Sequence, residues 1–247
     1  ETCKRIFSGR GCPPEKISVI MNSPDESIFQ CREPSTPCTK DIMRPWVIMY
    51  HGTLVERHGV DLAVAAIEKV RSSIPRVELR IYGRCTPFLE QVMDLVQKSE
   101  LPEVVRYLGP KKLEVVAEAI RECDIGIIPN RRSIFTELNT PTRILEYLSQ
   151  GKPVIAPRAP GILEYFGPED LVFFELGDVN DLAVKIEYAF SHPEEMARMV
   201  KRAQKVYSAH KWSCERQQLV SLVERLLNIT ERPHFNRMFG FHSRKAK

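Results

Sequence analysis

The sequence predicts an α/β fold with a doubly wound, Rossmann-like parallel sheet. Two observations carry this prediction. Short apolar runs that end in glycine or proline recur along the chain, as expected for buried strands. Segments with apolar residues at helical spacing lie between them. Strands joined by single helices need crossover connections, which give a parallel sheet covered by helices on both faces.

The predicted elements alternate regularly from residue 46 onward. Six strands are expected, at 46–52, 77–83, 104–109, 123–129, 152–157 and 171–176. Helices are expected at 60–70, 88–96, 113–120, 141–150, 161–167, 179–190, 193–208 and 213–228. The last helix places Leu219, Leu222, Val223 and Leu226 on one face. One doubly wound domain with two C-terminal helices follows.

Two helix starts have capping signals. Thr140 is the expected N-cap of the helix at 141–150, with Pro141 at its first position and Gly151 just past its end. Asp178 is the expected N-cap of the helix at 179–190.

The residues before and after this domain have a different composition. Residues 16–21, KISVIM, are a short strand-like run, and the stretch that follows is rich in Pro, Ser, Thr and charge. We therefore predict an irregular first segment over 1–45, the Rossmann-like domain over 46–230 and a basic tail over 231–247.

The totals are typical of a soluble globular protein. The 247 residues are 43% hydrophobic and 28% charged, and the net charge of +4 weakly favours anionic ligands. The seven cysteines are scattered without a CxxC pair, which favours free thiols over disulfides or zinc. No apolar run reaches the roughly 18 residues of a membrane span, and the first residues contain no signal-peptide core. A cytoplasmic location is expected.

Several nucleotide-site motifs are absent from the sequence. There is no GxGxxG fingerprint and no Walker sequence, because Lys152 is followed by Pro153. Dinucleotide oxidoreductases, epimerases and P-loop enzymes are therefore disfavoured. No Asp-x-Asp pair is present, so no metal and no cofactor are expected.

The segment NTPTRILEYLSQGKPVIAP contains the strongest candidate site. It places a helix N-terminus beside Thr142 and Arg143, where N–H groups and a guanidinium suit a diphosphate. Glu146 lies three residues after Arg143 on the same face, and its carboxylate could accept hydrogen bonds from a ribose diol. The alternative is a surface Arg–Glu pair on a capped helix.

Five segments together resemble the retaining glycosyltransferases of family 4, which have the GT-B fold. In chain order they are ISVIMNSPDESIF, YHGTLVERHG, CDIGIIPN with LEYLSQGKPVIAP, FFELGDVNDLA, and YSAHKW. The resemblance covers essentially the whole chain and implies the C-terminal, donor-binding half of a GT-B enzyme. It implies that residues 1–45 are a remnant of the N-terminal domain and the interdomain linker. It implies that Glu146 binds the ribose of a UDP- or GDP-linked sugar, while Gly52, Thr53, Arg57, His58 and Lys111 lie near the diphosphate and base.

Three positions depart from the family pattern. Leu138 stands where the family often has a first glutamate, with Glu137 one place away. Thr53 replaces an arginine and His58 replaces a lysine, although Arg57 is adjacent. The resemblance therefore supports Glu146 and Arg143 more strongly than the loop cations.

Two functions remain open at this point. The first is a donor-binding half of a glycosyltransferase, inactive alone, that acts with an acceptor-binding N-terminal domain in cis or in trans. That absent half could also contact a membrane surface peripherally, and no nucleic acid partner is expected. The second is a non-catalytic nucleotide-sugar-binding module that acts with a partner chain. The sugar, the base and the acceptor stay open.

Overall fold

The structure, a computed structural model, describes residues 1–34 and 44–227. Its centre is a six-stranded parallel sheet with the order β3-β2-β1-β4-β5-β6. The strands are β1 (Trp46–His51), β2 (Val77–Tyr82), β3 (Val105–Tyr107), β4 (Ile125–Ile127), β5 (Val154–Pro157) and β6 (Val172–Phe174). The predicted doubly wound parallel sheet is confirmed.

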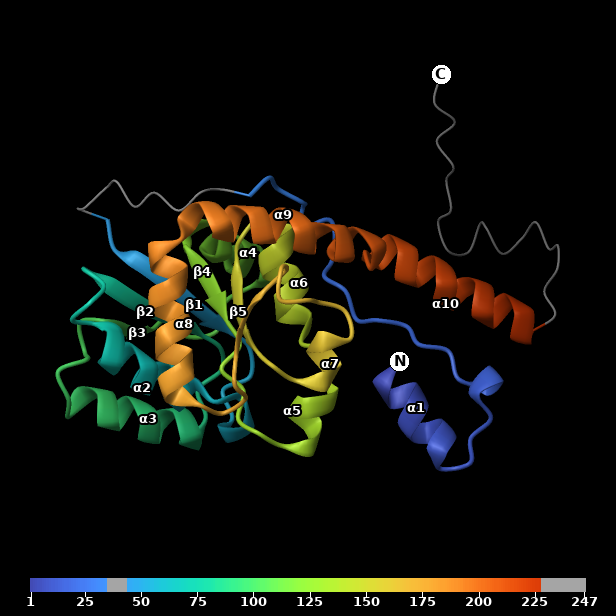
Figure 1. The fold of residues 1–247 in the computed structure, drawn as a ribbon, viewed down its shortest axis with the longest axis horizontal. Helices are drawn as coiled ribbons and strands as arrows, with labels where there is room; N and C mark the ends of the chain where they lie inside the picture. Colours follow the sequence, from blue (N-terminus) through green and yellow to red (C-terminus); the bar gives the residue numbers. More distant parts are fainter. Residues whose placement is uncertain (35–43, 228–247) are drawn as a thin grey trace, which may run out of the picture.

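Helices cover both faces of this sheet (Figure 1). One face packs against α2 (Val60–Val70), α3 (Pro87–Gln97) and α8 (Val179–Ser191). The other packs against α4 (Leu113–Glu122), α6 (Thr142–Ser149), α7 (Pro160–Leu163) and α9 (Pro193–Ala209). A strand buried on both faces needs apolar residues throughout, which explains the unbroken apolar runs in the sequence.

Strand β1 lies at the centre and shows how its side chains divide between the two cores. Trp46, Ile48 and Tyr50 join the core under α2 and α8, while Val47 and Met49 join the core under α6. The last residue, His51, follows the same alternation and lies on the α6 side. Its ring packs edge-on against Tyr147 of α6, with the centroids 4.9 Å apart.

The topological switch point lies between β1 and β4. The chain runs from β1 outward to β2 and β3, then returns to add β4 on the other side of β1. The connections that leave β1 and β4 therefore lead to helices on opposite faces of the sheet, α2 on one face and α6 on the other. Open α/β sheets bind their ligands in the crevice that forms at such a point.

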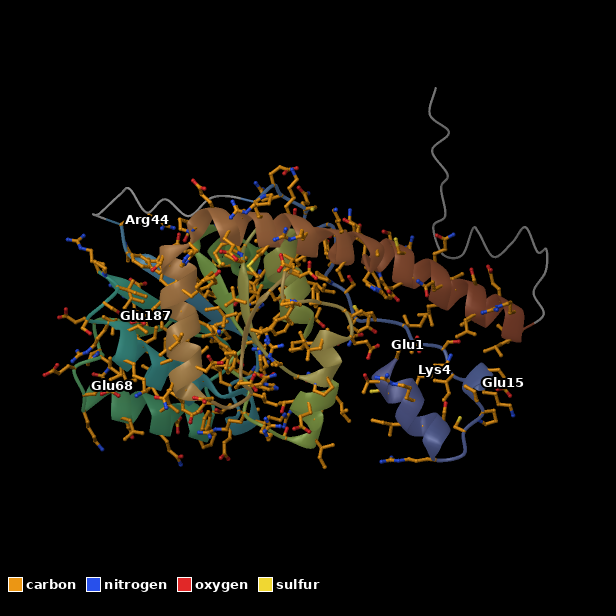
Figure 2. The ribbon with its side chains drawn as sticks, viewed as in Figure 1. Glu1, Lys4, Glu15, Arg44, Glu68 and Glu187 are labelled. Atoms are coloured by element: carbon orange, nitrogen blue, oxygen red, sulfur yellow. The ribbon has the colours of Figure 1, made fainter. Side chains whose placement is uncertain are left out.

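The two C-terminal helices are α9 and α10 (Trp212–Leu226), and α10 extends well beyond the sheet (Figure 1). Helix α1 (Thr2–Gly9) and the single turn η1 (Pro14–Lys16) lie beneath it. In Figure 2, Glu1, Lys4 and Glu15 lie at this end, far from Glu68 and Glu187. Residues of α1, of 17–20 and of α10 line a shared cavity of about 620 Å³.

The segment that links α1 to the sheet is bonded to three helices. Met21 N donates to Glu215 Oε2 at 3.0 Å, and Arg32 N donates to Ser149 O at 2.8 Å. Gln204 Nε2 donates to Arg32 O at 2.7 Å. The strand predicted over 16–21 is wrong, because this segment runs beside helices and pairs with no strand of the described residues.

The predicted cap at Thr140 is also wrong. Helix α6 starts at Thr142 after Pro141, and the Thr140 hydroxyl donates instead to Gly161 O at 2.7 Å. Asp178 does cap α8, accepting from the Asn180 and Asp181 amides. Gly151 follows the end of α6 with φ +72°, as predicted.

The sequence missed one short helix and did not indicate how exposed the last helix is. Helix α5 (Ile134–Leu138) lies in the segment after β4, where Ser133 and Thr136 form a capping box. Leu219, Val223 and Leu226, which the sequence places on one apolar face of the last helix, are exposed.

The domain boundaries stay predictions. The tail at 231–247 and Cys38 lie outside the described residues. Among the helices described, none has the length and apolar character needed to cross a membrane.

Candidate functional site

The candidate site lies where the loops after β1 and β4 meet. Gly59 ends the single turn η2 (Glu56–His58) with φ +64° and starts α2. A Cβ at Gly59 would lie 1.9 Å from Pro129 O, so only glycine permits this approach. Arg131 N donates to Arg57 O at 3.0 Å across the same contact. The two loops at the switch point are thus locked together.

Helix α6 brings Arg143 to the end of β1. Arg143 Nη1 donates to His51 O at 2.9 Å, and its guanidinium lies over the Tyr50 ring, 4.7 Å from the centroid. Gly52 directly follows β1 with φ +128°, and a Cβ there would lie 3.2 Å from Arg143 Cδ. Thr142, the first residue of α6, is partly exposed. The structure therefore groups Gly52, Thr142 and Arg143 at a helix N-terminus, an arrangement that suits anions.

Glu146 lies one turn further along α6 and also contacts His51. Its Oε2 is 2.5 Å from His51 Nε2, and its side chain is 15% exposed. His51 Nδ1 lies 2.9 Å from the Tyr147 hydroxyl, which lies 2.7 Å from Met49 O. Burial lowers the pKa of His51, and the hydrogen bond to Glu146 offsets only part of this decrease. The Glu146 carboxylate is thus fixed at the edge of the site.

The loop after β1 supplies Thr53, Arg57 and His58. Thr53 is exposed, and its carbonyl oxygen accepts from Tyr50 Oη at 2.8 Å and lies 2.9 Å from His58 Nδ1. Arg57 is exposed, and its guanidinium lies 5.1 Å from the centre of the Phe135 ring in α5. Burial lowers the pKa of His58, and the positive charges of Arg143 and Arg57 lower it further. The three basic side chains therefore share one electrostatic environment.

Lys111 stands apart from this group. It is exposed on the loop after β3, two strands away from β1 in the sheet. The loops after β1, β2 and β3 are nonetheless continuous: Gly52 N donates to Tyr82 O at 3.0 Å, and Gly83 N donates to Gly109 O at 3.2 Å. Among the described residues, no contact joins Lys111 to Arg143 or Glu146.

Three functional candidates were missed from the sequence, namely His51, Tyr147 and Tyr50. A polar residue at the end of the otherwise apolar run WVIMYH was the available signal for His51. Tyr147 gave no such signal, because an aromatic residue in an amphipathic helix is an ordinary core residue.

Asn130 is a further polar residue at the switch point. It follows β4 by three residues and is 1% exposed. Both polar atoms of its side chain are buried without a hydrogen-bond partner among the residues described. Such orphaned groups are rare in native structures, and a water molecule or a polar ligand would satisfy this one.

The geometry suits one class of ligand. A helix N-terminus with Arg143 suits an anion, a carboxylate one turn away suits a pair of hydroxyl donors, and the loops after β2 and β3 extend the surface sideways. A nucleoside diphosphate presents these groups in that order.

Two curated relatives match more than half of this chain. WcaL, a Salmonella typhimurium protein assigned to colanic acid biosynthesis as a glycosyltransferase, is 24% identical over 164 residues. The D-inositol 3-phosphate glycosyltransferase of Corynebacterium kroppenstedtii is 25% identical over 164 residues. These matches cover 64% and 60% of this chain but only 39% and 34% of the relatives.

Solved structures share the fold over nearly the whole chain. Anabaena HepE in complex with UDP superposes with a TM-score of 0.75 at 18% identity, covering 90% of this chain and 61% of HepE. A glycosyltransferase from Rickettsia africae gives a TM-score of 0.76 at 17% identity, covering 93% and 62%. These neighbours show the GT-B-like, Rossmann-like architecture.

A family model assigns the chain more directly. The model described as glycosyl transferases group 1 matches residues 39–206, from before β1 to within α9. This range contains the sheet and every predicted site residue. The chain therefore belongs to the group 1 glycosyl transferase family.

Proposed function

We propose that this chain is the donor-binding part of a retaining, family 4 glycosyltransferase that uses a UDP- or GDP-linked sugar. The observation that carries the proposal is the pairing of Arg143 and Glu146 on α6 at the end of β1. In this proposal Arg143 and the N–H groups of the first turn of α6 bind the diphosphate. Glu146 binds the ribose, and the loops after β2 and β3, with Lys111, lie toward the base.

The chemistry assigned to this half is electrostatic. When the bond between the sugar and the diphosphate breaks, negative charge builds up on the leaving phosphate. A fixed guanidinium and a helix N-terminus stabilise that charge in the transition state more than in the bound donor. Arg57 and His58 add positive charge from the loop after β1. This role needs no cofactor, and we expect none.

The structural neighbours support the choice of ligand. HepE has been solved with UDP and with UDP-glucose, and it shares this fold. The curated relatives are named as glycosyltransferases. The ligands of HepE support, by analogy, a nucleotide sugar as the ligand of this chain.

We further propose that the acceptor is bound by another domain, in cis or in trans. The chain spans 39% and 34% of its curated relatives. Helix α10 exposes Leu219, Val223 and Leu226 beside the cavity it shares with α1, a surface that a second domain would cover. A peripheral membrane contact would belong to that domain. The exposed free cysteines Cys3, Cys31 and Cys85 fit the cytoplasmic location that we propose.

Calorimetry tests the donor site. UDP, GDP, uridine and guanosine are titrated into the folded chain. We expect a nucleoside diphosphate to bind and the matching nucleoside to bind far more weakly, because the diphosphate contributes much of the binding free energy. No binding of any nucleoside diphosphate by folded protein would refute the proposal.

A non-catalytic binding module remains the second candidate. Leu138 favours it, since the family often has a glutamate at that position. A transfer assay separates the two candidate functions. It supplies the chain with radiolabelled nucleotide sugars and with lipid and sugar acceptors, with and without cell extract. We expect transfer only when extract is added, whereas binding without transfer in either condition would favour the module. Robust transfer by the chain alone would contradict an acceptor site on another domain.

A further inference from the structure

Three residues of β1 face α6, and His51 is the polar one among them. The other two, Val47 and Met49, are apolar core residues. His51 is 6% exposed, and both of its ring nitrogens have partners. Nε2 faces Glu146 Oε2 at 2.5 Å, and Nδ1 faces the Tyr147 hydroxyl at 2.9 Å. Packing against Tyr147 and these two contacts leave the ring a single orientation.

We propose that His51 is a positioning residue that holds the Glu146 carboxylate ready for the ribose hydroxyls of the donor. The proposal rests on the proposed function, because it assigns a role within the same nucleotide site. His51 is not proposed to touch the reacting atoms.

The two carboxylate oxygens of Glu146 have different surroundings. Oε2 is taken by His51, and Oε1 has no hydrogen-bond partner among the residues described. A free glutamate side chain would have to be ordered when the ribose binds, which weakens binding. Because His51 already fixes the carboxylate, Oε1 is presented without that cost.

The hydrogen atoms of this network are consistent with a donor at Nε2. The Tyr147 hydroxyl has one hydrogen and lies near two acceptor positions, Met49 O at 2.7 Å and His51 Nδ1 at 2.9 Å. If the ring is neutral with its hydrogen on Nε2, the hydroxyl must turn from Met49 O to donate to Nδ1. If the ring is charged, Nδ1–H donates to the Tyr147 oxygen, the hydroxyl donates to Met49 O, and Nε2 again carries a hydrogen. In both states His51 Nε2 donates to Glu146 Oε2.

Burial and the charged groups around His51 act on its pKa in opposite directions. Burial lowers the pKa of His51 most, and the nearby charge of Arg143 lowers it further, while the hydrogen bond and charge of Glu146 raise it. Tyr147 faces the ring from α6 as an uncharged phenol, because burial raises its own pKa well above its usual value. In both the neutral and the charged form of this network, Nε2 keeps the hydrogen that faces Glu146 Oε2.

Two variants of His51 separate positioning from general packing. The side-chain amide of glutamine can reach the place of Nε2 and donate to Glu146. The shorter asparagine can reach only the place of Nδ1. Both keep a polar side chain at the end of β1, so they are matched in character and differ in reach.

The test measures affinity for UDP and GDP and for their 2′-deoxy and 3′-deoxy forms by calorimetry. For His51→Asn we expect affinity for the better nucleotide to fall on the order of tenfold, with a much smaller loss for the deoxy form that lacks the hydroxyl bound by Glu146. His51→Gln should recover most of the affinity. Thermal unfolding of each variant shows that folded protein is compared, and ¹⁵N NMR of the wild-type ring should show hydrogen on Nε2.

Other outcomes overturn the proposal. If His51→Asn weakens the ribose and deoxy nucleotides equally, His51 supports only the strand end. If His51→Asn binds like the wild type, Glu146 needs no support. If the wild type binds a nucleoside diphosphate but does not discriminate the deoxy forms, the ribose role fails while the donor site stands. If it binds no nucleoside diphosphate, the proposed function fails and this inference with it.

Discussion

Arg143 donates a hydrogen bond from Nη1 to the backbone carbonyl oxygen of His51, at 2.9 Å, across 92 residues of sequence. The same guanidinium lies on the face of the Tyr50 ring. Arginine uses its planar fork for both contacts at once, whereas a lysine ammonium cannot reproduce that geometry. The cation is therefore oriented before any ligand arrives.

Arg143→Lys should weaken binding of UDP or GDP by about 1.5–3 kcal/mol, because a charge-assisted hydrogen bond to the diphosphate is lost. Binding of the matching nucleoside should change little. Calorimetry with both ligands measures the difference. Arg198→Lys, an exposed change on α9, is the control and should leave both affinities unchanged. An equal loss for diphosphate and nucleoside would argue against a phosphate contact.

Glu146→Gln and Glu146→Ala should differ in stability although both bind nucleotide more weakly. Both should lose about 1.5–3 kcal/mol of affinity, since the charged acceptor for the ribose is gone. The alanine variant also leaves His51 Nε2 without its partner, which should lower the free energy of unfolding by about 1–3 kcal/mol. Glutamine can still accept from Nε2. Urea unfolding measures the stability of each variant, and calorimetry measures its affinity for the nucleotide. Unchanged affinity in both folded variants would show that Glu146 has only a structural role.

Gly59→Ala should lower the free energy of unfolding by about 2–4 kcal/mol. The new Cβ would lie 1.9 Å from Pro129 O, and the residue has φ +64°. Urea denaturation gives the value. Gly9→Ala at the end of α1 is the matched control, because nothing lies within 4 Å of its Cβ and its φ is not positive. A Gly59→Ala variant as stable as Gly9→Ala would show that the loops after β1 and β4 do not meet.

Nucleotide binding should take up protons through His58. Burial and the Arg143 and Arg57 charges lower the pKa of His58 in the free protein, and a bound diphosphate should raise it again. Affinity for UDP or GDP should therefore increase as pH falls from 7.5 to about 6, near the ordinary histidine pKa of about 6.5. Calorimetry in buffers with different ionisation enthalpies counts the protons. His58→Gln should lose this uptake, and retained uptake would place the titrating group elsewhere.

The thiols should differ widely in reactivity. Cys123 is fully buried, its Sγ lies 3.2 Å from Ile120 O, and burial raises its pKa to about 12. Cys85 is exposed on the loop after β2. In native protein, iodoacetamide followed by peptide mass spectrometry should label Cys85 quickly and leave Cys123 unmodified until the chain unfolds. Fast native labelling of Cys123 would contradict the packing of α4 on β1.

Local periodicity was enough to predict most of the fold. The helix expected at 60–70 is α2 with the same bounds, since its apolar spacing and Gly59 are local signals. The run at 16–21 failed because a strand needs a neighbouring strand, and here Met21 N finds the Glu215 carboxylate instead. Thr140 failed because α6 begins one residue later than expected, with Pro141 at the N-cap position, and the Thr140 hydroxyl donates to Gly161 O.

The candidate site was predicted in part. Arg143 and Glu146 are three residues apart on one helix, so their shared face follows from sequence alone. The role of His51 does not, because its partner Glu146 lies 95 residues away and meets it only through the packing of α6 on the sheet. Exposure of the apolar residues on α10 also depends on tertiary surroundings that periodicity does not report.

The strand order has a consequence for how the chain folds. Strands β1, β2 and β3 pair in sequence order and can assemble as soon as they are synthesised. The other side of β1 must wait for β4, and the contact of Val47 N with Asp124 closes 77 residues of chain. Loop closure on that scale is slow compared with local pairing. We therefore expect the nascent chain to expose an apolar strand edge until the β4 segment emerges, and the switch-point crevice to be completed only in the late steps of folding.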